Sequence, residues 1–122
     1  MSVSEHWFPV CQVADLVEGS GVAVLLNGQQ VALFYLPNEA KTIYAIDNFD
    51  PIGRANVLSR GIVGDIGGEL VVASPLYKQH FSLHTGKCLE QDQAVRVWPV
   101  RIKDEQVKLR QAAAPVKMGN AA

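Results

Sequence analysis

Hydrophobic periodicity favours β-strands along almost the whole chain. The clearest pair is formed by the apolar runs 21–27 and 30–36, which are separated by Asn27-Gly28, a dipeptide typical of tight β-hairpin turns. The same kind of pattern predicts further short strands over residues 6–11, 42–46, 70–73, 81–83, 94–103 and 106–110. A helical turn is predicted only at residues 13–17.

Turn signals separate these short strands at close intervals, which indicates an all-β fold of the small sandwich or barrel type. Gly67-Gly68 precedes one strand, Thr85-Gly86 follows another, and Asp104-Glu105 forms the tip of the last hairpin. Residues 48–60 form a long polar loop of the kind that often carries function. Periodicity is lost at the end of the chain, so we expect one domain over residues 1–111 and a disordered tail over 112–122.

Composition narrows the possible functions. The 122 residues suffice for a single core, and 48% of them are hydrophobic. Eleven basic and twelve acidic residues give a net charge of −1. Tight binding to nucleic acid or to an anionic membrane is therefore not expected. The sequence shows no signal peptide and no apolar run near the roughly 20 residues that span a bilayer, which predicts a cytoplasmic protein with free, reduced cysteines.

Histidine and cysteine are the obvious reactive candidates. His80 and His84 are four residues apart, and Cys88 could supply a third metal ligand, but their segment is predicted as a strand and a turn. Lys87 could lower the pKa of Cys88, whereas Cys11 lies in an apolar strand and is expected to be a small buried side chain. Taken residue by residue, these groups do not define an active site.

Residues 44–65 and 69–89 resemble the cluster-binding half of Rieske-type ferredoxin domains. In that family a loop C-P-H or C-x-H follows a strand ending in Asp-Asn-x, and a second loop, C-P-x-H-G, precedes a strand ending in Thr-Gly. Here Asp47-Asn48-Phe49 matches the first lead-in, and Thr85-Gly86 matches the end of the later strand. The resemblance implies a Rieske-like [2Fe–2S] ferredoxin fold.

The four ligand positions of that family are filled by residues of other types. Asp50 and Ser74 stand where the thiolates belong, and Ile52 and Tyr77 stand where the imidazoles belong. A Rieske centre needs two thiolates on one iron and two imidazoles on the other. We therefore expect the fold without its cluster, and no metal or other cofactor in this chain.

The phrase D-N-F-D-P at residues 47–51, its continuation A-N-V-L-S-R-G-I-V-G-D at 55–65, the early His6-Trp7 and the emptied loops are together similar to the small subunits of assimilatory NAD(P)H-dependent nitrite reductases. That resemblance implies a partner, the large subunit, which carries FAD, an iron–sulfur cluster and sirohaem and reduces nitrite to ammonium with electrons from NADH. This chain would be required for activity while contributing no catalytic residue.

The resemblance also implies that loops 50–56 and 74–79 lie side by side at one tip of the fold. We expect that tip to contact the large subunit through aromatic and aliphatic side chains with a basic rim, as protein interfaces often do. The candidate interface residues are Phe49, Ile52, Arg54, Leu76, Tyr77 and Lys78. The alternative for Phe49, Leu76 and Tyr77 is that they fill the volume left by the absent cluster.

Three other functions stay open at this point. The chain could be an electron-transfer ferredoxin with unusual ligands, which would contain iron. It could be a stand-alone binding module that takes a small molecule in the vacated pocket, which would give a thermal shift without a partner. It could also be an enzyme that uses Cys88, His80 and His84, in which case Cys88→Ser would abolish its activity.

Overall fold

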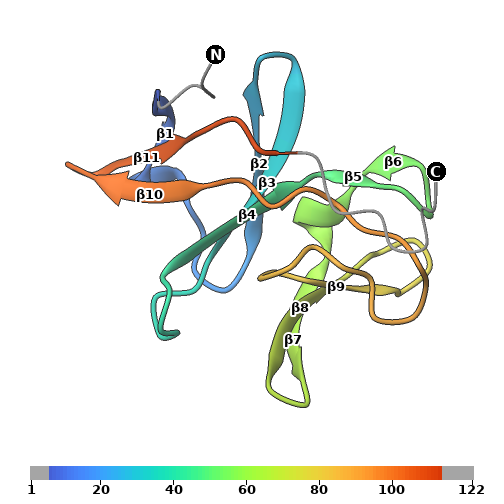
Figure 1. The fold of residues 1–122 in the computed structure, drawn as a ribbon. Helices are drawn as coiled ribbons and strands as arrows, with labels where there is room; N and C mark the ends of the chain where they lie inside the picture. Colours follow the sequence, from blue (N-terminus) through green and yellow to red (C-terminus); the bar gives the residue numbers. More distant parts are fainter. Residues whose placement is uncertain (1–5, 114–122) are drawn as a thin grey trace.

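The computed structural model describes residues 6–113, which form four small antiparallel sheets (Figure 1). Their strand orders are β1-β11-β10, β2-β3-β4, β5-β6 and β7-β8-β9. Two single 3₁₀ turns, η1 and η2, are the only helices in this part of the chain, and neither could reach across a lipid bilayer. The elements are β1 (Phe8–Gln12), η1 (Val13–Asp15), β2 (Gly21–Leu26), β3 (Gln29–Tyr35), β4 (Ile43–Asp47), β5 (Phe49–Asp50), β6 (Ala55–Asn56), η2 (Leu58–Arg60), β7 (Ile62–Ile66), β8 (Glu69–Ala73), β9 (His80–Ser82), β10 (Val100–Lys103) and β11 (Gln106–Leu109).

Strands β3 and β4 form the centre of the molecule because both of their faces are buried. Successive side chains of a strand point to opposite sides. Phe34 and Tyr44 accordingly join one hydrophobic cluster, while Leu33 and Ala45 join another on the opposite face. Two-sided burial explains why residues 31–36 are almost continuously apolar rather than alternating.

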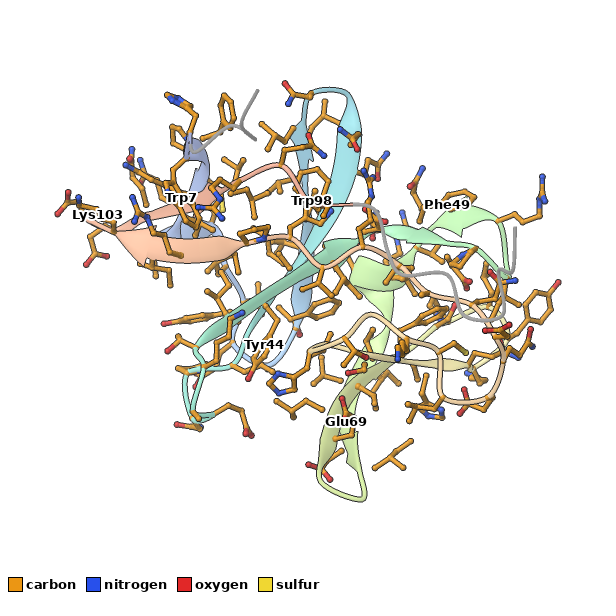
Figure 2. The ribbon with its side chains drawn as sticks, viewed as in Figure 1. Trp7, Tyr44, Phe49, Glu69, Trp98 and Lys103 are labelled. Atoms are coloured by element: carbon orange, nitrogen blue, oxygen red, sulfur yellow. The ribbon has the colours of Figure 1, made fainter. Side chains whose placement is uncertain are left out.

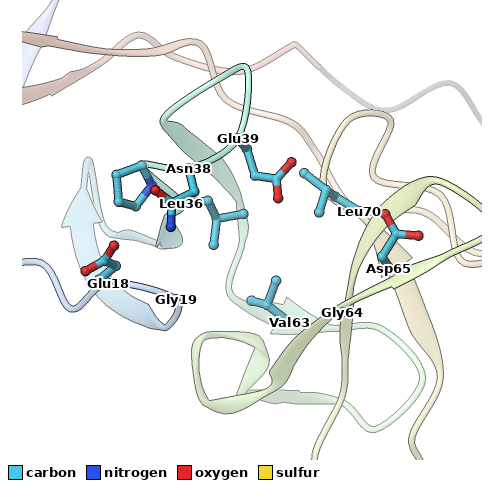
Figure 3. Close-up of a pocket in the computed structure, with 10 residues that line it drawn as sticks. Glu18, Gly19, Leu36, Asn38, Glu39, Val63, Gly64, Asp65 and Leu70 are labelled. Atoms are coloured by element: carbon cyan, nitrogen blue, oxygen red, sulfur yellow. The ribbon is translucent and has the colours of Figure 1, made fainter.

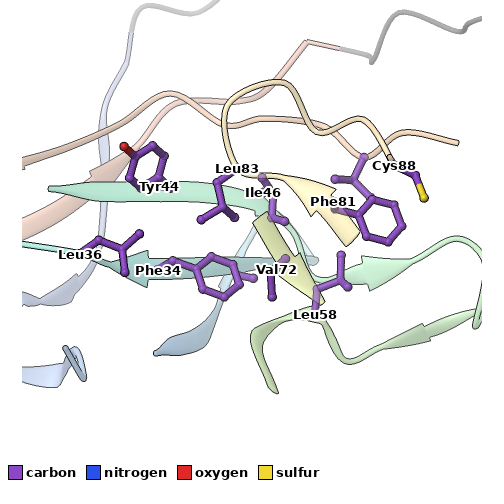
Figure 4. Packing of buried hydrophobic residues seen from close by; sticks show 11 residues of the cluster. Phe34, Leu36, Tyr44, Ile46, Leu58, Val72, Phe81, Leu83 and Cys88 are labelled. Atoms are coloured by element: carbon purple, nitrogen blue, oxygen red, sulfur yellow. The ribbon is translucent and has the colours of Figure 1, made fainter. Parts of the chain in front are cut away.

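The first cluster lies between β3-β4 and the sheet β7-β8-β9 (Figure 4). Phe34 and Ile46 from the central strands meet Val72 from β8 and Phe81 from β9, and all four are fully buried. Leu58 of η2 completes this contact. The second predicted loop, 74–79, follows β8, and the first, 50–56, follows β4. The cluster therefore holds the strands that precede the two loops against each other.

The second cluster joins the opposite face of β3-β4 to the sheet β1-β11-β10. Trp98 is its largest side chain and is fully buried. Its indole N–H donates to Asp47 Oδ1 at 2.9 Å, and Arg96 forms an ion pair with the same carboxylate at 3.0 Å. Asp47 is the last residue of β4 and directly precedes the first loop. Its carboxylate therefore holds the segment that contains Arg96 and Trp98 against the start of that loop.

Most of the predicted strands are present, at shifted ends. The hairpin at Asn27-Gly28 is confirmed, and both residues have positive φ, 52° and 75°, as a type I′ turn requires. The final hairpin around Asp104-Glu105 is also confirmed. The helical turn predicted at 13–17 is the shorter η1, and the long loop 48–60 contains β5, β6 and η2.

Two segments differ from the prediction. Strand β7 was not predicted because its sequence, IVGDI, contains Gly64 and Asp65 and leaves Ile62 75% exposed. The strand predicted over 94–103 begins only at Val100, after Pro99. Residues before it form isolated bridges instead, among them Ile46 with Val97.

The structure describes the C-terminal end of the chain only as far as residue 113. The disordered tail predicted for 112–122 falls largely outside residues 6–113. Within them, Ala112 is 8% exposed and belongs to the second cluster. The packed chain therefore includes one residue beyond the predicted domain end at 111.

Gly86 gives a test of the packing beyond the second loop. It has a φ of +77°, and a Cβ at this position would lie 2.1 Å from the backbone oxygen of Val95. Gly28 has a similar φ of +75° but open space around it. Gly28→Ala should cost about 1–2 kcal/mol for the left-handed backbone alone. Gly86→Ala should cost about 1–3 kcal/mol more, because the clash is with backbone. Urea denaturation of both variants checks this, and equal losses would contradict it.

Candidate functional site

The two loops predicted to have lost their ligands follow the same backbone path. In the first, the N–H of Arg54 donates to the carbonyl oxygen of Asp50 at 2.6 Å. In the second, the N–H of Lys78 donates to the carbonyl oxygen of Ser74 at 3.0 Å. Arg54 and Lys78 both have positive φ, 62° and 67°. Each loop is thus a five-residue turn with proline second and a left-handed residue last, and Lys78 occupies the position of the glycine in the second motif.

A hydrogen bond between the first residues of the two turns joins the loops directly. Ser74 Oγ donates to Asp50 Oδ2 at 2.5 Å, and both residues are completely buried. These are the two positions at which the resemblance places cluster thiolates. The sequence predicted that both positions lack a thiolate, but it did not predict that their side chains would bond to each other.

The remaining polar atoms of this pair are also satisfied. Asp50 Oδ1 accepts from the backbone N–H of Ile52 at 2.8 Å and of Gly53 at 3.0 Å. Ser74 Oγ accepts from the N–H of Leu76 at 3.3 Å. Since burying an unpaired polar group costs free energy, this arrangement favours closed loops over open ones.

Gly53 allows the loops to close fully. A Cβ on Gly53 would lie 2.4 Å from Leu76 Cδ1 and 3.0 Å from Asp50 Oδ2. The leucine of the second loop therefore covers the backbone of the first. Sequence reasoning missed Gly53, and its only signal was a single glycine inside a polar loop.

Asn48 fixes the first loop to the body of the protein. This residue is 2% exposed. Its side-chain N–H donates to Gln30 Oε1 at 2.9 Å, and its Oδ1 accepts from the N–H of Ser59 at 2.7 Å. The Asp-Asn pair before the loop therefore anchors it on both sides. Asp47 binds the segment that contains Trp98, and Asn48 binds η2.

These residues do not fit a [2Fe–2S] cluster. Asp50 and Ser74 direct their oxygens at each other rather than toward a shared metal position. Ile52 has no lone pair and packs against the first hydrophobic cluster, and Tyr77 is 64% exposed. A Rieske centre depends on thiolate and imidazole donors, and none of the four positions supplies one.

The structure places the six candidate interface residues around these closed turns. Arg54 and Lys78 are exposed, as the predicted basic rim requires. Tyr77 is the most exposed of the hydrophobic members. Phe49 and Leu76 are each 44% exposed, whereas Ile52 is half-buried and partly fills the core. Figure 2 shows Phe49 on the outer side of β5, at the opposite end of the molecule from Lys103. Whether these residues contact a partner stays a prediction.

His80 and Cys88 share a contact with Glu90, whereas His84 packs elsewhere. The ring of His80 pairs with Glu90 at 2.6 Å, and the Cys88 thiol lies 3.6 Å from the same carboxylate. His84 packs edge-on against the ring of Tyr44, with centroids 5.2 Å apart. Burial raises the pKa of the Cys88 thiol, which opposes the lowering expected from Lys87. Among residues 6–113 no group of three or more His, Cys, Asp or Glu side chains is arranged to hold a metal ion.

The fold and the paired turns are those of a Rieske-like domain, and comparison with known proteins agrees. Residues 6–110 match the family model of the Rieske-like [2Fe-2S] domain. The nitrite reductase (NADH) small subunit of Salmonella typhimurium is 45% identical over 106 residues, which cover 86% of this chain and 97% of that protein. The NMR structure of the Escherichia coli protein NirD superimposes with a TM-score of 0.79 at 39% identity, covering 88% of this chain and 98% of that one.

A third relative has a different length. Part of the "nitrite reductase [NAD(P)H] large subunit" of Klebsiella oxytoca is 42% identical over 105 residues, which cover 85% of this chain but only 11% of that protein. The chain belongs to the Rieske-like domain family and, within it, to the family of nitrite reductase small subunits.

The bond between the two turns can be tested by removing its donor. Ser74→Ala leaves Asp50 Oδ2 buried without this partner, so the free energy of unfolding should fall by about 1–3 kcal/mol. Ser20→Ala is the control, since Ser20 is exposed and should change stability by less than about 0.5 kcal/mol. Urea denaturation measures both, and equal effects of the two substitutions would contradict the proposed contact.

Glu90 should make stability depend on pH. Burial opposes its ionisation, but hydrogen bonds from the backbone N–H and the ring of His80 outweigh this and lower the pKa of Glu90. Its contribution is therefore complete above its ordinary pKa of 4.5 and is lost as pH falls through the lowered value. Glu90→Gln should cost less than about 1 kcal/mol near pH 7 and nothing at low pH. Urea midpoints from pH 2 to 7 test this against exposed Asp92→Asn, which should show no such convergence.

Proposed function

We propose that this chain is the cluster-free small subunit of an NAD(P)H-dependent nitrite reductase and works with a separate large subunit to reduce nitrite to ammonium in nitrate assimilation. The large subunit would carry FAD, an iron–sulfur cluster and sirohaem. The complex would act in the cytoplasm, where NAD(P)H is available. In this proposal no residue of the small subunit takes part in the chemistry, and its role is to bind and organise its partner.

The observation that carries the proposal is the 45% identity to a nitrite reductase small subunit across 97% of that protein's length. The geometry supports a role without a resident redox centre. The positions that would hold a cluster are instead closed by the hydrogen bond between Asp50 and Ser74. A closed site of this kind has a structural use, because it holds the two turns in fixed relation without any cofactor.

The Klebsiella relative supports the choice of partner. There, a domain similar to this chain forms 11% of a polypeptide named as a nitrite reductase large subunit. A domain that shares a chain with the rest of an enzyme is positioned to contact it. In a two-chain enzyme the same contact has to be formed by a surface on each subunit.

We propose that the contact surface is the tip formed by the two turns. Phe49, Leu76 and Tyr77 expose aromatic and aliphatic area there, and the basic residues Arg54 and Lys78, which end the two turns, are also exposed. Tyrosine and arginine are among the residues that contribute most to protein interfaces. The turns are rigid because their buried polar atoms are paired, which lowers the entropy lost on binding.

The geometry does not favour a ligand in the vacated cluster position. Asp50 and Ser74 are completely buried and bonded to each other, and Leu76 covers the backbone at Gly53. The raised pKa of Cys88 likewise favours the unreactive thiol over a nucleophilic thiolate.

The direct test is nitrite-dependent oxidation of NADH by the large subunit, measured with and without this chain. We expect a several-fold gain in rate that saturates as the chain is added in excess. A denatured sample of the same chain is the control. No change in rate, together with no binding between the two chains, would overturn the proposal.

Substitutions in the tip should weaken the complex without unfolding the chain. We expect Tyr77→Ala and Arg54→Glu each to raise the dissociation constant about 10- to 100-fold, since both side chains are exposed members of the proposed surface. Ile102→Ala and Lys103→Glu are matched controls on β10, at the far end of the molecule (Figure 2), and should change it less than twofold.

Co-purification and titration with the large subunit measure these affinities, and thermal unfolding verifies that each variant folds. Wild-type affinity in both folded tip variants would remove the two turns from the interface.

A further inference from the structure

A pocket of about 300 Å³ lies away from the two turns (Figure 3). Three segments that are distant in the sequence surround it. They are the turn before β2, the loop between β3 and β4, and the hairpin β7-β8. The lining residues that matter below are Glu18, Leu36, Glu39, Val63, Asp65 and Leu70.

The floor of this pocket is apolar and fixed in place. Leu36 is part of the first hydrophobic cluster, and Val63 and Leu70 pack against the same cluster. Figure 3 shows Leu36 facing Val63 and Leu70, which come from the two strands of the β7-β8 hairpin. The floor is therefore a solvent-facing extension of the core, and it offers hydrocarbon for another side chain to cover.

The rim of the pocket is acidic. Glu18 and Asp65 lie on opposite sides in Figure 3, and Glu39 lies above the floor. Within residues 6–113 none of these three carboxylates forms a salt bridge. Lys41, two residues beyond Glu39, instead places its Nζ over the ring of Tyr44, 5.2 Å from the centroid.

An apolar floor beneath carboxylates that form no salt bridge within the described residues matches one type of side chain. Lysine and arginine have a hydrocarbon stem that packs on apolar surface and a cationic end that stays at the edge. Such a group would cover Leu36, Val63 and Leu70, and its cationic end would be attracted by the three carboxylates. A neutral group would gain no such attraction, and an anionic group would be repelled.

We propose that this pocket is a second docking site, which receives a lysine or arginine side chain of the nitrite reductase large subunit. The inference rests on the proposed function and adds to it a contact distinct from the two turns. The choice of occupant follows from charge complementarity at the rim. The choice of the large subunit as the partner is supported by the Klebsiella relative, in which a similar segment is part of a polypeptide named as the large subunit.

The test neutralises the rim while preserving its shape. The triple variant Glu18→Gln/Glu39→Gln/Asp65→Asn retains the side-chain oxygen of residue 65 that accepts from Gly68. The control removes the same number of charges at exposed sites elsewhere, in Asp92→Asn/Asp104→Asn/Glu105→Gln. Both full-length variants are titrated against the intact large subunit at 50 and 300 mM NaCl, after thermal unfolding shows that they fold.

We expect the pocket variant to bind at least tenfold more weakly at 50 mM NaCl and to show less dependence on salt than the wild type. The control should stay within twofold of wild type. Equal weakening in both variants would indicate general charge attraction and overturn the inference, as would wild-type affinity in the pocket variant.

The experiment distinguishes failure of this inference from failure of the proposed function. If the wild type does not bind the large subunit, the proposed function and the second docking site are both wrong. If Tyr77→Ala weakens binding while the pocket variant does not, only the second docking site is wrong. A further arm titrates the isolated chain with n-butylammonium chloride. Saturable millimolar binding at Leu36, Val63 and Leu70, with unchanged affinity of the pocket variant for the large subunit, would assign the pocket to a free organic cation instead.

Discussion

The hydrogen bond between Ser74 and Asp50 is the contact that holds the two turns of the candidate site in their closed arrangement. The two turns, which would carry the cluster ligands in a Rieske centre, are joined here by an oxygen–oxygen contact of 2.5 Å that is buried from water. The pair is self-consistent because the second carboxylate oxygen accepts two backbone N–H groups and the hydroxyl accepts a third. Removing either side chain would leave buried polar atoms without partners, which is costly in a dry interior. The fold thus keeps the paired turns of a Rieske-like domain, and a hydrogen bond joins the two positions at which that family has its cluster thiolates.

The two hydrophobic clusters and the strands between them position the two turns next to each other. Strands β3 and β4 are buried on both faces, so each hydrophobic cluster positions a different part of the chain against the same two strands. At the end of β4, Asp47 binds the segment that contains Trp98, and Asn48 binds η2. The first turn therefore begins from a rigid point, and the second begins from β8, which the first cluster holds in place. A tip built in this way can present exposed residues such as Tyr77 with little motion to restrict on binding.

Much of the fold could be predicted from the sequence because local signals and burial agree there. Asn27-Gly28 indicates a type I′ turn, and both φ angles have that sign. Strand β7 could not be predicted in the same way, since Gly64 and Asp65, which are rare in strands, interrupt its Ile and Val residues, and its pairing with β8 supplies the order. In the candidate site, too, some features could be predicted from the sequence and others could not. The positions of Asp50, Ile52, Ser74 and Tyr77 followed from a motif, whereas the bond between two of them and the fit of Leu76 over Gly53 depend on a contact between loops that are 24 residues apart.

The most direct test of this account is the content of iron and acid-labile sulfide in the chain, expressed with an intact iron–sulfur assembly system and purified without oxygen. The account predicts far less than one iron per chain and no electron paramagnetic resonance signal of a reduced Rieske centre. A matched sample of a cluster-bearing Rieske ferredoxin, prepared in parallel, shows that clusters survive the procedure. About two iron and two sulfide per chain, with such a signal, would contradict the account, because the closed pair of Asp50 and Ser74 leaves no donor set for a cluster.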